Sequence, residues 1–309
     1  MEKWFYEKFR INFFHMKILT LIPIFNPQSS LFDSILPLLQ HQSIDLELIL
    51  INSGKEEINI ANIKSIKISP SEFNHANTRN MALAYDTDYY LFMTQDAMPY
   101  DEYLIENLIK AFDDSSVVVA YARQIPYKDA DITEVFARTS NYPSISNVKS
   151  KEDILSLGIK TFFNSDSCSM YRASYFKQVG GFTKDLKTNE DMEFAARAIM
   201  DGKKVAYIAD AKVYHSHNFT YKDIWKRYRA IGKFFRENSW ILDVVSQHTK
   251  MESTGIKQAV TEIEYLLKNS PLDIPRSCLY SFLKYIAFKS VCNSFLYTIF
   301  SSYFDWRKK

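Results

Sequence analysis

Residues 89–96 read YYLFMTQD: five apolar residues run directly into a threonine, a glutamine and an aspartate. An apolar run without polar alternation predicts a strand that is covered on both faces of its sheet. Similar runs occupy residues 17–25 and 46–51, and the second of these ends in Asn52 and Ser53. Ligands of open α/β sheets bind beyond the carboxyl ends of the strands. These polar strand ends are therefore the first candidate site.

Stretches with helical periodicity separate the predicted strands. We expect helices near residues 29–40, 74–85, 101–112 and 190–200, and further strands at 66–68, 117–122, 169–172 and 205–214. Strands that alternate with helices at this spacing predict an α/β fold with a mostly parallel sheet. After residue 221 the chain is predicted to be helical almost throughout, with breaks at Pro271 and Pro275.

Composition excludes several classes of protein. The chain has 309 residues, 47% hydrophobic and 24% charged, which is typical of a folded protein rather than a disordered one. Its seven glycines form neither a dinucleotide-binding fingerprint nor a P-loop. Its three cysteines are widely spaced, which disfavours a zinc ribbon or a disulfide framework and suits a reduced, cytoplasmic protein. We expect neither a secretory signal nor a transmembrane helix.

The net charge of +2 is unevenly distributed. Residues 1–17, 221–240 and 271–309 together carry +10, and the rest of the chain carries −8. Aromatic residues are interleaved with these basic ones, a composition that suits a membrane interface. We expect peripheral attachment to an anionic membrane surface at the inner face of the cell membrane. In the alternative, these aromatic side chains pack against one another or across a homodimer. A nucleic-acid partner is not expected, because it would leave the polar strand ends unexplained.

Eight short motifs follow one another along the chain. They are IPIFN (22–26), NSG (52–54), FNHANTRN (73–80), TQDAMP (94–99), SDSCSMYR (165–172), GF (181–182), ED (190–191) and HSH (215–217). Their order and spacing resemble the family 2 glycosyltransferases, inverting enzymes of GT-A fold, and in particular the rhamnosyltransferase-like branch. The resemblance implies a GT-A-like domain over residues 16–220, with an extension at 1–15 and a helical, basic-aromatic region at 221–309.

The resemblance also implies a nucleotide-sugar donor whose diphosphate is screened by Mg²⁺ or Mn²⁺. Asp96 stands at the second aspartate of the family's Asp-x-Asp pattern, and Thr94 replaces the first. One carboxylate remains, so the metal needs further ligands. In the family, a histidine of the HSH motif completes the coordination of the metal or contacts the diphosphate. We expect His217 or His215 to do so here, with a preference for His217.

Reaction chemistry is assigned through the same resemblance. Asp191 corresponds to the family's general base, which takes the proton of an acceptor hydroxyl during a one-step, inverting attack. Its neighbour Glu190 and the segment containing Asp166, Cys168 and Ser169 are expected to face the donor sugar and the acceptor.

Donor recognition is expected at the strand ends and on the helix after the third strand. The predicted nucleotide-binding residues are Pro23, Phe25, Asn26, Asn52, Ser53, Asn74, Arg79, Gln95 and Asp96. Asn52 and Ser53 replace the family's common pair of aspartates. Arg79 offers a planar cation that matches phosphate oxygens.

The resemblance implies transfer of a deoxysugar, best described as L-rhamnose from dTDP-β-L-rhamnose, in cell-surface polysaccharide synthesis. The acceptor is a saccharide, free or lipid-linked. One alternative keeps the enzyme class but uses a UDP-hexose or UDP-N-acetylhexosamine donor. Another alternative is a non-catalytic module that binds a glycan or a membrane surface. This alternative predicts that Asp96, Asp191 and His217 do not converge on one cleft.

Overall fold

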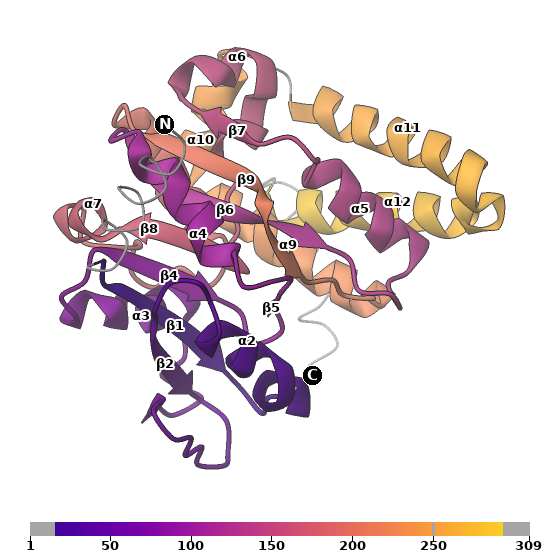
Figure 1. Ribbon diagram of the computed structural model, residues 1–309. Coiled ribbons are helices and arrows are strands. Elements are labelled where there is room, and N and C mark those ends of the chain that lie inside the picture. The colour runs from indigo at the N-terminus through magenta and orange to yellow at the C-terminus, as the bar shows by residue number, and fades with distance from the viewer. Residues whose placement is uncertain (1–15, 249–250, 293–309) are drawn as a thin grey trace, which may run out of the picture.

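The computed structural model describes residues 16–248 and 251–292 and is built around one large sheet (Figure 1). The nine strands follow the order β3-β2-β1-β4-β8-β6-β9-β5, and β7 pairs with β9. Their bounds are β1 (Ile18–Ile24), β2 (Glu47–Asn52), β3 (Lys64–Lys67), β4 (Tyr89–Met93), β5 (Met98–Pro99), β6 (Val117–Ile125), β7 (Asn147–Lys149), β8 (Cys168–Arg172) and β9 (Lys204–Tyr214).

Helices connect and cover these strands. The α-helices are α2 (Leu36–Gln40), α3 (His75–Asn80), α4 (Leu104–Ile109), α5 (Ile132–Asn141), α6 (Ile154–Leu157), α7 (Ala173–Gln178), α8 (Glu190–Met200), α9 (Tyr221–Glu237), α10 (Ser239–Ser246), α11 (Met251–Asn269) and α12 (Ile274–Cys292). A π-helical turn precedes α2 at Leu31–Ile35, and 3₁₀ turns include Met81–Ala84, Lys110–Asp113 and Gly158–Phe162.

Most of the sheet runs in one direction. The pairs β3–β2, β2–β1, β1–β4 and β6–β9 are parallel, whereas β8 runs antiparallel between β4 and β6. The strands β1 to β4, β6 and β9 therefore share one direction, and β5, β7 and β8 oppose it. This arrangement confirms the predicted α/β fold with a mostly parallel sheet.

The central strand β4 explains why its sequence is continuously apolar. All five of its residues are buried. Tyr90 and Phe92 belong to one hydrophobic core, and Leu91 and Met93 belong to a second core on the other face, as the two-residue period of a strand requires. Burial of each such side chain stabilises the fold by about 1.5–3 kcal/mol.

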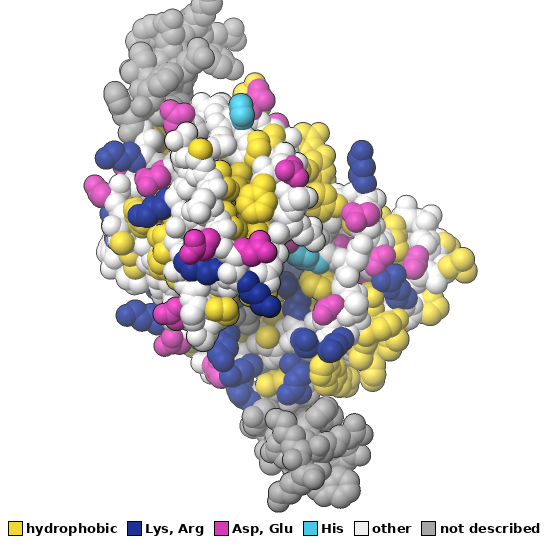
Figure 2. All heavy atoms as spheres, turned by 90° about the horizontal axis from the view of Figure 1, so that it is seen from below, with side chains coloured by type: hydrophobic (Ala, Val, Ile, Leu, Met, Phe, Trp, Pro, Cys, Tyr) yellow, Lys and Arg dark blue, Asp and Glu magenta, His cyan; other side chains and the backbone are white. Residues whose placement is uncertain are grey.

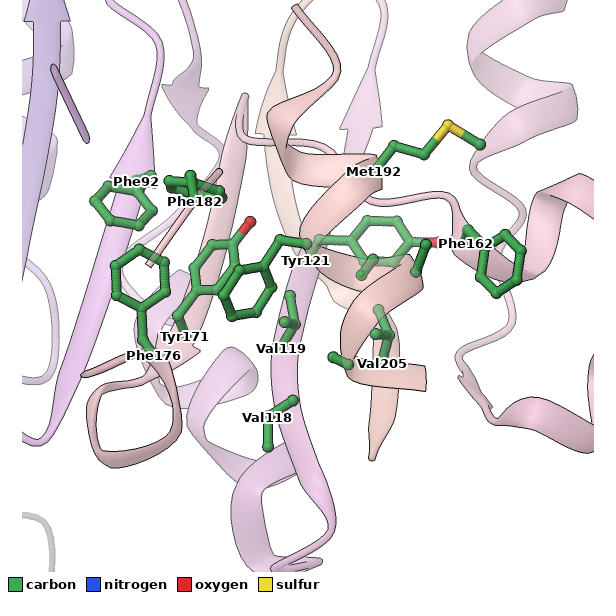
Figure 3. Packing of buried hydrophobic residues seen from close by; sticks show 14 of the residues in the cluster. Phe92, Val118, Val119, Tyr121, Phe162, Tyr171, Phe176, Phe182, Met192 and Val205 are labelled. Atoms are coloured by element: carbon green, nitrogen blue, oxygen red, sulfur yellow. The ribbon is translucent and has the colours of Figure 1, made fainter. Parts of the chain in front are cut away.

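Aromatic rings form the centre of the first core. Phe92 lies 5.3 Å from Tyr171, 5.6 Å from Phe176 and 5.4 Å from Phe182 between ring centroids, and Figure 3 shows the four rings together. Tyr171 comes from β8, whereas Phe182 precedes α8. The core thus fixes the segment before α8 against β4, the strand that leads to Asp96.

The C-terminal segment is helical where the structure describes it, as predicted. Thr220 caps α9 by accepting a hydrogen bond from the backbone N–H of Asp223, whose carboxylate bonds back to the backbone N–H of Thr220. α9 packs closely on α12, because a Cβ at Gly232 would lie 2.5 Å from the carbonyl oxygen of Phe288. Among the described helices, none is long and apolar enough to cross a membrane.

Some predictions differ from the observed elements or lie outside them. β7 was not predicted, because Lys149 is its only buried residue and no apolar run marks it. The extension at residues 1–15 and the end of the basic-aromatic region at 293–309 lie outside the described residues. The domain divide at residue 220 stays a prediction.

Candidate active site

A cavity of about 630 Å³ lies at the carboxyl ends of β1 and β4. Asp96, Asp191 and His217 all line it, although more than a hundred residues separate Asp96 from His217. The non-catalytic alternative required these three residues not to converge, and that expectation is wrong. Figure 2 shows a hollow on this side of the molecule with Lys and Arg side chains gathered beside it.

Asp96 and the two histidines form one end of the cavity. The Nε2 atom of His215 lies 3.5 Å from Asp96 Oδ1, and the Nε2 atom of His217 lies 3.4 Å from Asp96 Oδ2. The two Nε2 atoms are 3.1 Å apart. One ligand atom from each residue lies within 4.8 Å of the others, a spacing that suits a single metal ion. Both histidines therefore converge with Asp96, not His217 alone.

The hydrogen-bond network behind His215 fixes its tautomer. His215 Nδ1 lies 2.8 Å from Oε1 of the buried Gln124 on β6. Arg138 donates to the same Gln124 atom, and a guanidinium can only donate, so this atom is the amide oxygen. Nδ1 of His215 must then carry a hydrogen, and Nε2 is the ring atom that faces Asp96. This is the second-sphere arrangement that orients metal-binding histidines.

Protonation states at this end also suit a cation. Burial raises the pKa of Asp96, but a hydrogen bond from His215 and the charge of that ring outweigh it, so the net pKa lies below its usual range. Burial, followed by the neighbouring His215, lowers the pKa of His217. Metal binding needs an ionised carboxylate and neutral imidazoles, and the lowered pKa values of Asp96 and His217 favour these forms of those two residues.

Asp191 lies in the first turn of α8, in a second, acidic part of the cavity lining. Its Oδ1 accepts a hydrogen bond from the backbone N–H of Met192 at 2.7 Å, and its Oδ2 accepts one from the backbone N–H of Asp166 at 3.1 Å. Burial, followed by the charge of Glu190, raises the pKa of Asp191 to about 6. A carboxylate with a pKa just below neutral is ionised at pH 7 and is a stronger proton acceptor than an ordinary aspartate.

Arg79 holds this acidic part together. Its Nη1 donates to Glu190 Oε1 at 2.7 Å, and its Nε lies 3.3 Å from Asp166 Oδ2, with all three side chains buried. Burial lowers the pKa of Arg79, but the charges of Asp166 and Glu190 outweigh that effect and raise it. Arg79 lines the cavity, but its guanidinium pairs with carboxylates. In this structure the guanidinium compensates buried negative charge, and its expected contact with the nucleotide stays a prediction.

Two asparagines on α3 tie this helix to the segment before α8, and sequence reasoning missed both. Asn80 donates to the carbonyl of Phe182 at 2.8 Å and accepts from its N–H at 2.9 Å. Asn77 bonds in the same two-way manner to Asp185. A Cβ at Gly181, where φ is +77°, would lie 2.4 Å from Asn80 Oδ1, so this turn requires glycine. The FNHANTRN motif thus positions the ED motif.

Phe25, Pro23 and Gln95 line the cavity beside Asp96. Gln95 Oε1 accepts from the backbone N–H of Phe25 at 2.8 Å, and its Nε2 donates to the carbonyl of Phe25 at 3.3 Å. The backbone of Phe25 is thereby fixed while its ring stays 54% exposed. An exposed, positioned ring suits a flat partner such as a nucleobase.

The remaining predicted ligands do not line the cavity. Ser53 donates to the carbonyl of Ile24, Asn52 bonds to the backbone of Gly54 and Glu56, Asn26 accepts from the backbone N–H of Lys55, and Asn74 caps α3. Cys168 is buried in the second hydrophobic core, and Ser169 donates to Asn164. The geometry gives these six residues structural roles within the chain.

Comparisons with known proteins find related sequences over most of the chain. The family model for glycosyl transferase family 2 matches residues 20–180, and that for glycosyl transferase family group 2 matches residues 105–301. The O-antigen chain rhamnosyltransferase RfbN of Salmonella typhimurium is 40% identical over 283 residues, which is 89% of each chain. The O-antigen chain rhamnosyltransferase WbaN of Salmonella anatum is 41% identical over 79% of this chain and 78% of its own.

Solved structures share the fold at low sequence identity. A mannosyltransferase of Pyrobaculum calidifontis in complex with GDP-Man and Mn²⁺ matches with a TM-score of 0.57 at 11% identity, over 88% of this chain and 87% of the other. TarS residues 1–349 of S. aureus in complex with UDP match with a TM-score of 0.52 at 14% identity, over 91% of both chains.

Replacing Arg79 by methionine should destabilise the protein by about 3–5 kcal/mol, because it leaves buried carboxylates without their counter-charge. Burial holds the pKa of Asp166 and of Asp191 above their unfolded values, so the stability linked to these groups is present at low pH and lost as pH rises. The loss caused by Arg79→Met should therefore be larger at pH 8 than at pH 5, as measured by urea unfolding.

The exposed pair of Lys177 and Asp86 supplies the control. Lys177→Met should change stability little at either pH, because exposed ion pairs contribute little. An Arg79→Met protein with a near-normal, pH-independent free energy of unfolding would contradict the role given to Arg79.

Proposed function

The chain belongs to glycosyltransferase family 2, and on that premise we propose that it transfers L-rhamnose from dTDP-β-L-rhamnose to a saccharide acceptor in cell-surface polysaccharide synthesis. The observation that carries this proposal is the convergence of Asp96, His215 and His217 with Asp191 on one cavity. The sugar is proposed because two relatives at 40% and 41% identity are O-antigen chain rhamnosyltransferases.

The donor's nucleotide is proposed to lie against Phe25, with its diphosphate toward Asp96. A divalent cation held by Asp96, His215 and His217 would screen the charge that develops on the diphosphate as it leaves. We propose Mn²⁺ rather than Mg²⁺, because Mg²⁺ prefers oxygen ligands and this set supplies two imidazole nitrogens. A structure of the same fold contains GDP-Man and Mn²⁺, which supports the use of a divalent cation.

Asp191 is proposed to act as the general base. Its carboxylate takes the proton of an acceptor hydroxyl, whose oxygen attacks the anomeric carbon from the face opposite the diphosphate. The bond from the anomeric carbon to the phosphate oxygen breaks as the new glycosidic bond forms, so the anomeric centre inverts. The two backbone N–H groups that bind Asp191 hold its oxygens in place for this transfer.

Release of dTDP from dTDP-rhamnose plus acceptor tests the proposal. We expect turnover with this donor to exceed that with UDP-glucose, UDP-galactose or UDP-N-acetylglucosamine, and kcat to rise with pH through about 6, where Asp191 loses its proton. Asp191→Asn keeps the size of the side chain but cannot accept the proton, so turnover should fall about a hundredfold or more.

Donor binding serves as the control for that variant and should change little. Turnover that is fast only with a UDP-sugar would overturn the donor assignment, but the protein would still be a glycosyltransferase. Normal turnover by the Asp191→Asn variant would show that another residue is the general base.

We also propose that the surface formed by α9 and α12 attaches to the inner face of the cell membrane, where it meets a lipid-linked acceptor. Three side chains of this surface, Tyr221, Phe282 and Tyr285, are large and exposed. Lys222, Lys226, Arg227 and Lys233 are exposed on α9. Arg227 and Lys284 also line the cavity, so the proposed membrane surface adjoins the proposed acceptor entrance. Basic and aromatic side chains together suit an anionic lipid interface.

Co-sedimentation with vesicles tests this attachment. The full chain should bind vesicles that contain anionic lipid at low salt and be released at high salt. A variant with Phe282→Ser and Tyr285→Ser should bind roughly tenfold more weakly, because less apolar area enters the interface. Leu155→Ser, at an exposed position on α6, is the matched control and should bind normally. A protein that ignores anionic vesicles but forms a dimer sensitive to the double substitution would favour the homodimer instead.

A further inference from the structure

His75 lies in the cavity but has no part in the chemistry described so far. It is the first residue of α3, within the FNHANTRN motif, and its side chain is exposed to the cavity that it lines. Its ring packs edge to face with that of Phe73, with ring centroids 5.0 Å apart. The ring is thus held in place on one side while another side meets the cavity.

The contact with Arg79 determines the tautomer of His75. Arg79 Nη1 lies 3.3 Å from His75 Nδ1, and the same Nη1 donates to Glu190. A guanidinium can only donate, so Nδ1 must be the nitrogen with the lone pair. Burial, followed by the charge of Arg79, lowers the pKa of His75 to about 4, although the charge of Asp191 acts in the opposite direction. The ring is therefore neutral near pH 7 and carries its hydrogen on Nε2.

The Nε2–H group has no hydrogen-bond partner within residues 16–248 and 251–292. Asp191 is an electrostatic neighbour of His75, and Asp166 and Glu190 line the same part of the cavity, where both pair with Arg79. A phosphate would be repelled there, since like charges in a low-dielectric site interact strongly. A hydroxyl group fits, because it donates to a carboxylate and accepts from a neutral N–H at the same time.

We propose that His75 Nε2–H donates a hydrogen bond to a hydroxyl oxygen of a sugar beside Asp191, and so determines which saccharide the cavity accepts. The inference rests on the proposed function and deepens it, because it assigns a contact for the sugar rather than for the nucleotide. The hydroxyl belongs to the donor sugar or to the acceptor, and both share this chemistry.

Kinetics of the wild type, His75→Gln and His75→Ala test the contact, with dTDP-rhamnose varied in one series and the acceptor in the other. His75→Gln places an amide N–H near the position of Nε2, whereas His75→Ala removes the donor. We expect His75→Ala to lower kcat/KM about tenfold through a rise in KM, and His75→Gln to recover most of the loss. A rise in KM for dTDP-rhamnose identifies the donor sugar, and a rise in KM for the acceptor identifies the acceptor.

Deoxy analogues of the identified sugar then locate the hydroxyl. Removing the contacted hydroxyl should penalise the wild type about tenfold but leave His75→Ala unaffected, because that variant has already lost the bond. Equal melting temperatures of the three proteins would show that the fold is intact.

Two results would overturn the inference. The first is a His75→Ala protein with wild-type kcat/KM for both substrates. The second is a wild-type penalty for every deoxy analogue that persists unchanged in His75→Ala. Wild-type turnover separates this failure from a failure of the proposed function: no turnover with any nucleotide-sugar contradicts the function and this inference together, whereas normal wild-type turnover with an unaffected His75→Ala contradicts the inference alone.

Discussion

The guanidinium of Arg79 is surrounded by carboxylates that would repel one another without it. It pairs with Glu190 at 2.7 Å and lies 3.3 Å from Asp166, both of them buried. Removing buried charges from water costs several kcal/mol per ion, so these acids need such compensation. Burial and the charge of Glu190 raise the pKa of Asp191 to about 6, and two backbone hydrogen bonds and the charge of Arg79 limit this rise. The same guanidinium sets the tautomer of His75, so that one cation organises the acidic part of the cavity.

Two parts of the cavity lining suit different parts of a nucleotide-sugar. In one part Asp96 is ionised beside two imidazoles, which suits a divalent cation and, through it, a diphosphate. In the other part paired and unpaired carboxylates repel phosphate and suit the hydroxyl groups of a sugar. A nucleotide-sugar has the same order of groups, with an anionic diphosphate followed by a neutral polyol. Under the proposed function, this order would place the anomeric carbon of the donor toward Asp191.

Much of this arrangement follows from the sequence, and the rest depends on contacts that the sequence does not display. Apolar runs predict the strands, and their polar ends locate Asp96 and the histidine pair. The side-chain partners are different: Asn80 meets Phe182, 102 residues away, and Arg79 meets Glu190, 111 residues away. Local pattern says nothing about such pairs, so the ion pairs of Arg79 could not be predicted from the sequence. Cys168 and Ser169 were expected at the sugar, but β8 lies inside the sheet and buries both.

The central claim is that Asp96, with His215 and His217, binds the donor through a divalent cation. Titration calorimetry of dTDP-rhamnose with and without Mn²⁺ tests it most directly. The wild type should bind the donor tightly only with Mn²⁺, and Asp96→Ala should bind it weakly in both cases, with an unchanged melting temperature. Asp86→Ala, at an exposed surface aspartate, should behave like the wild type. Tight, Mn²⁺-dependent donor binding by Asp96→Ala would contradict the claim.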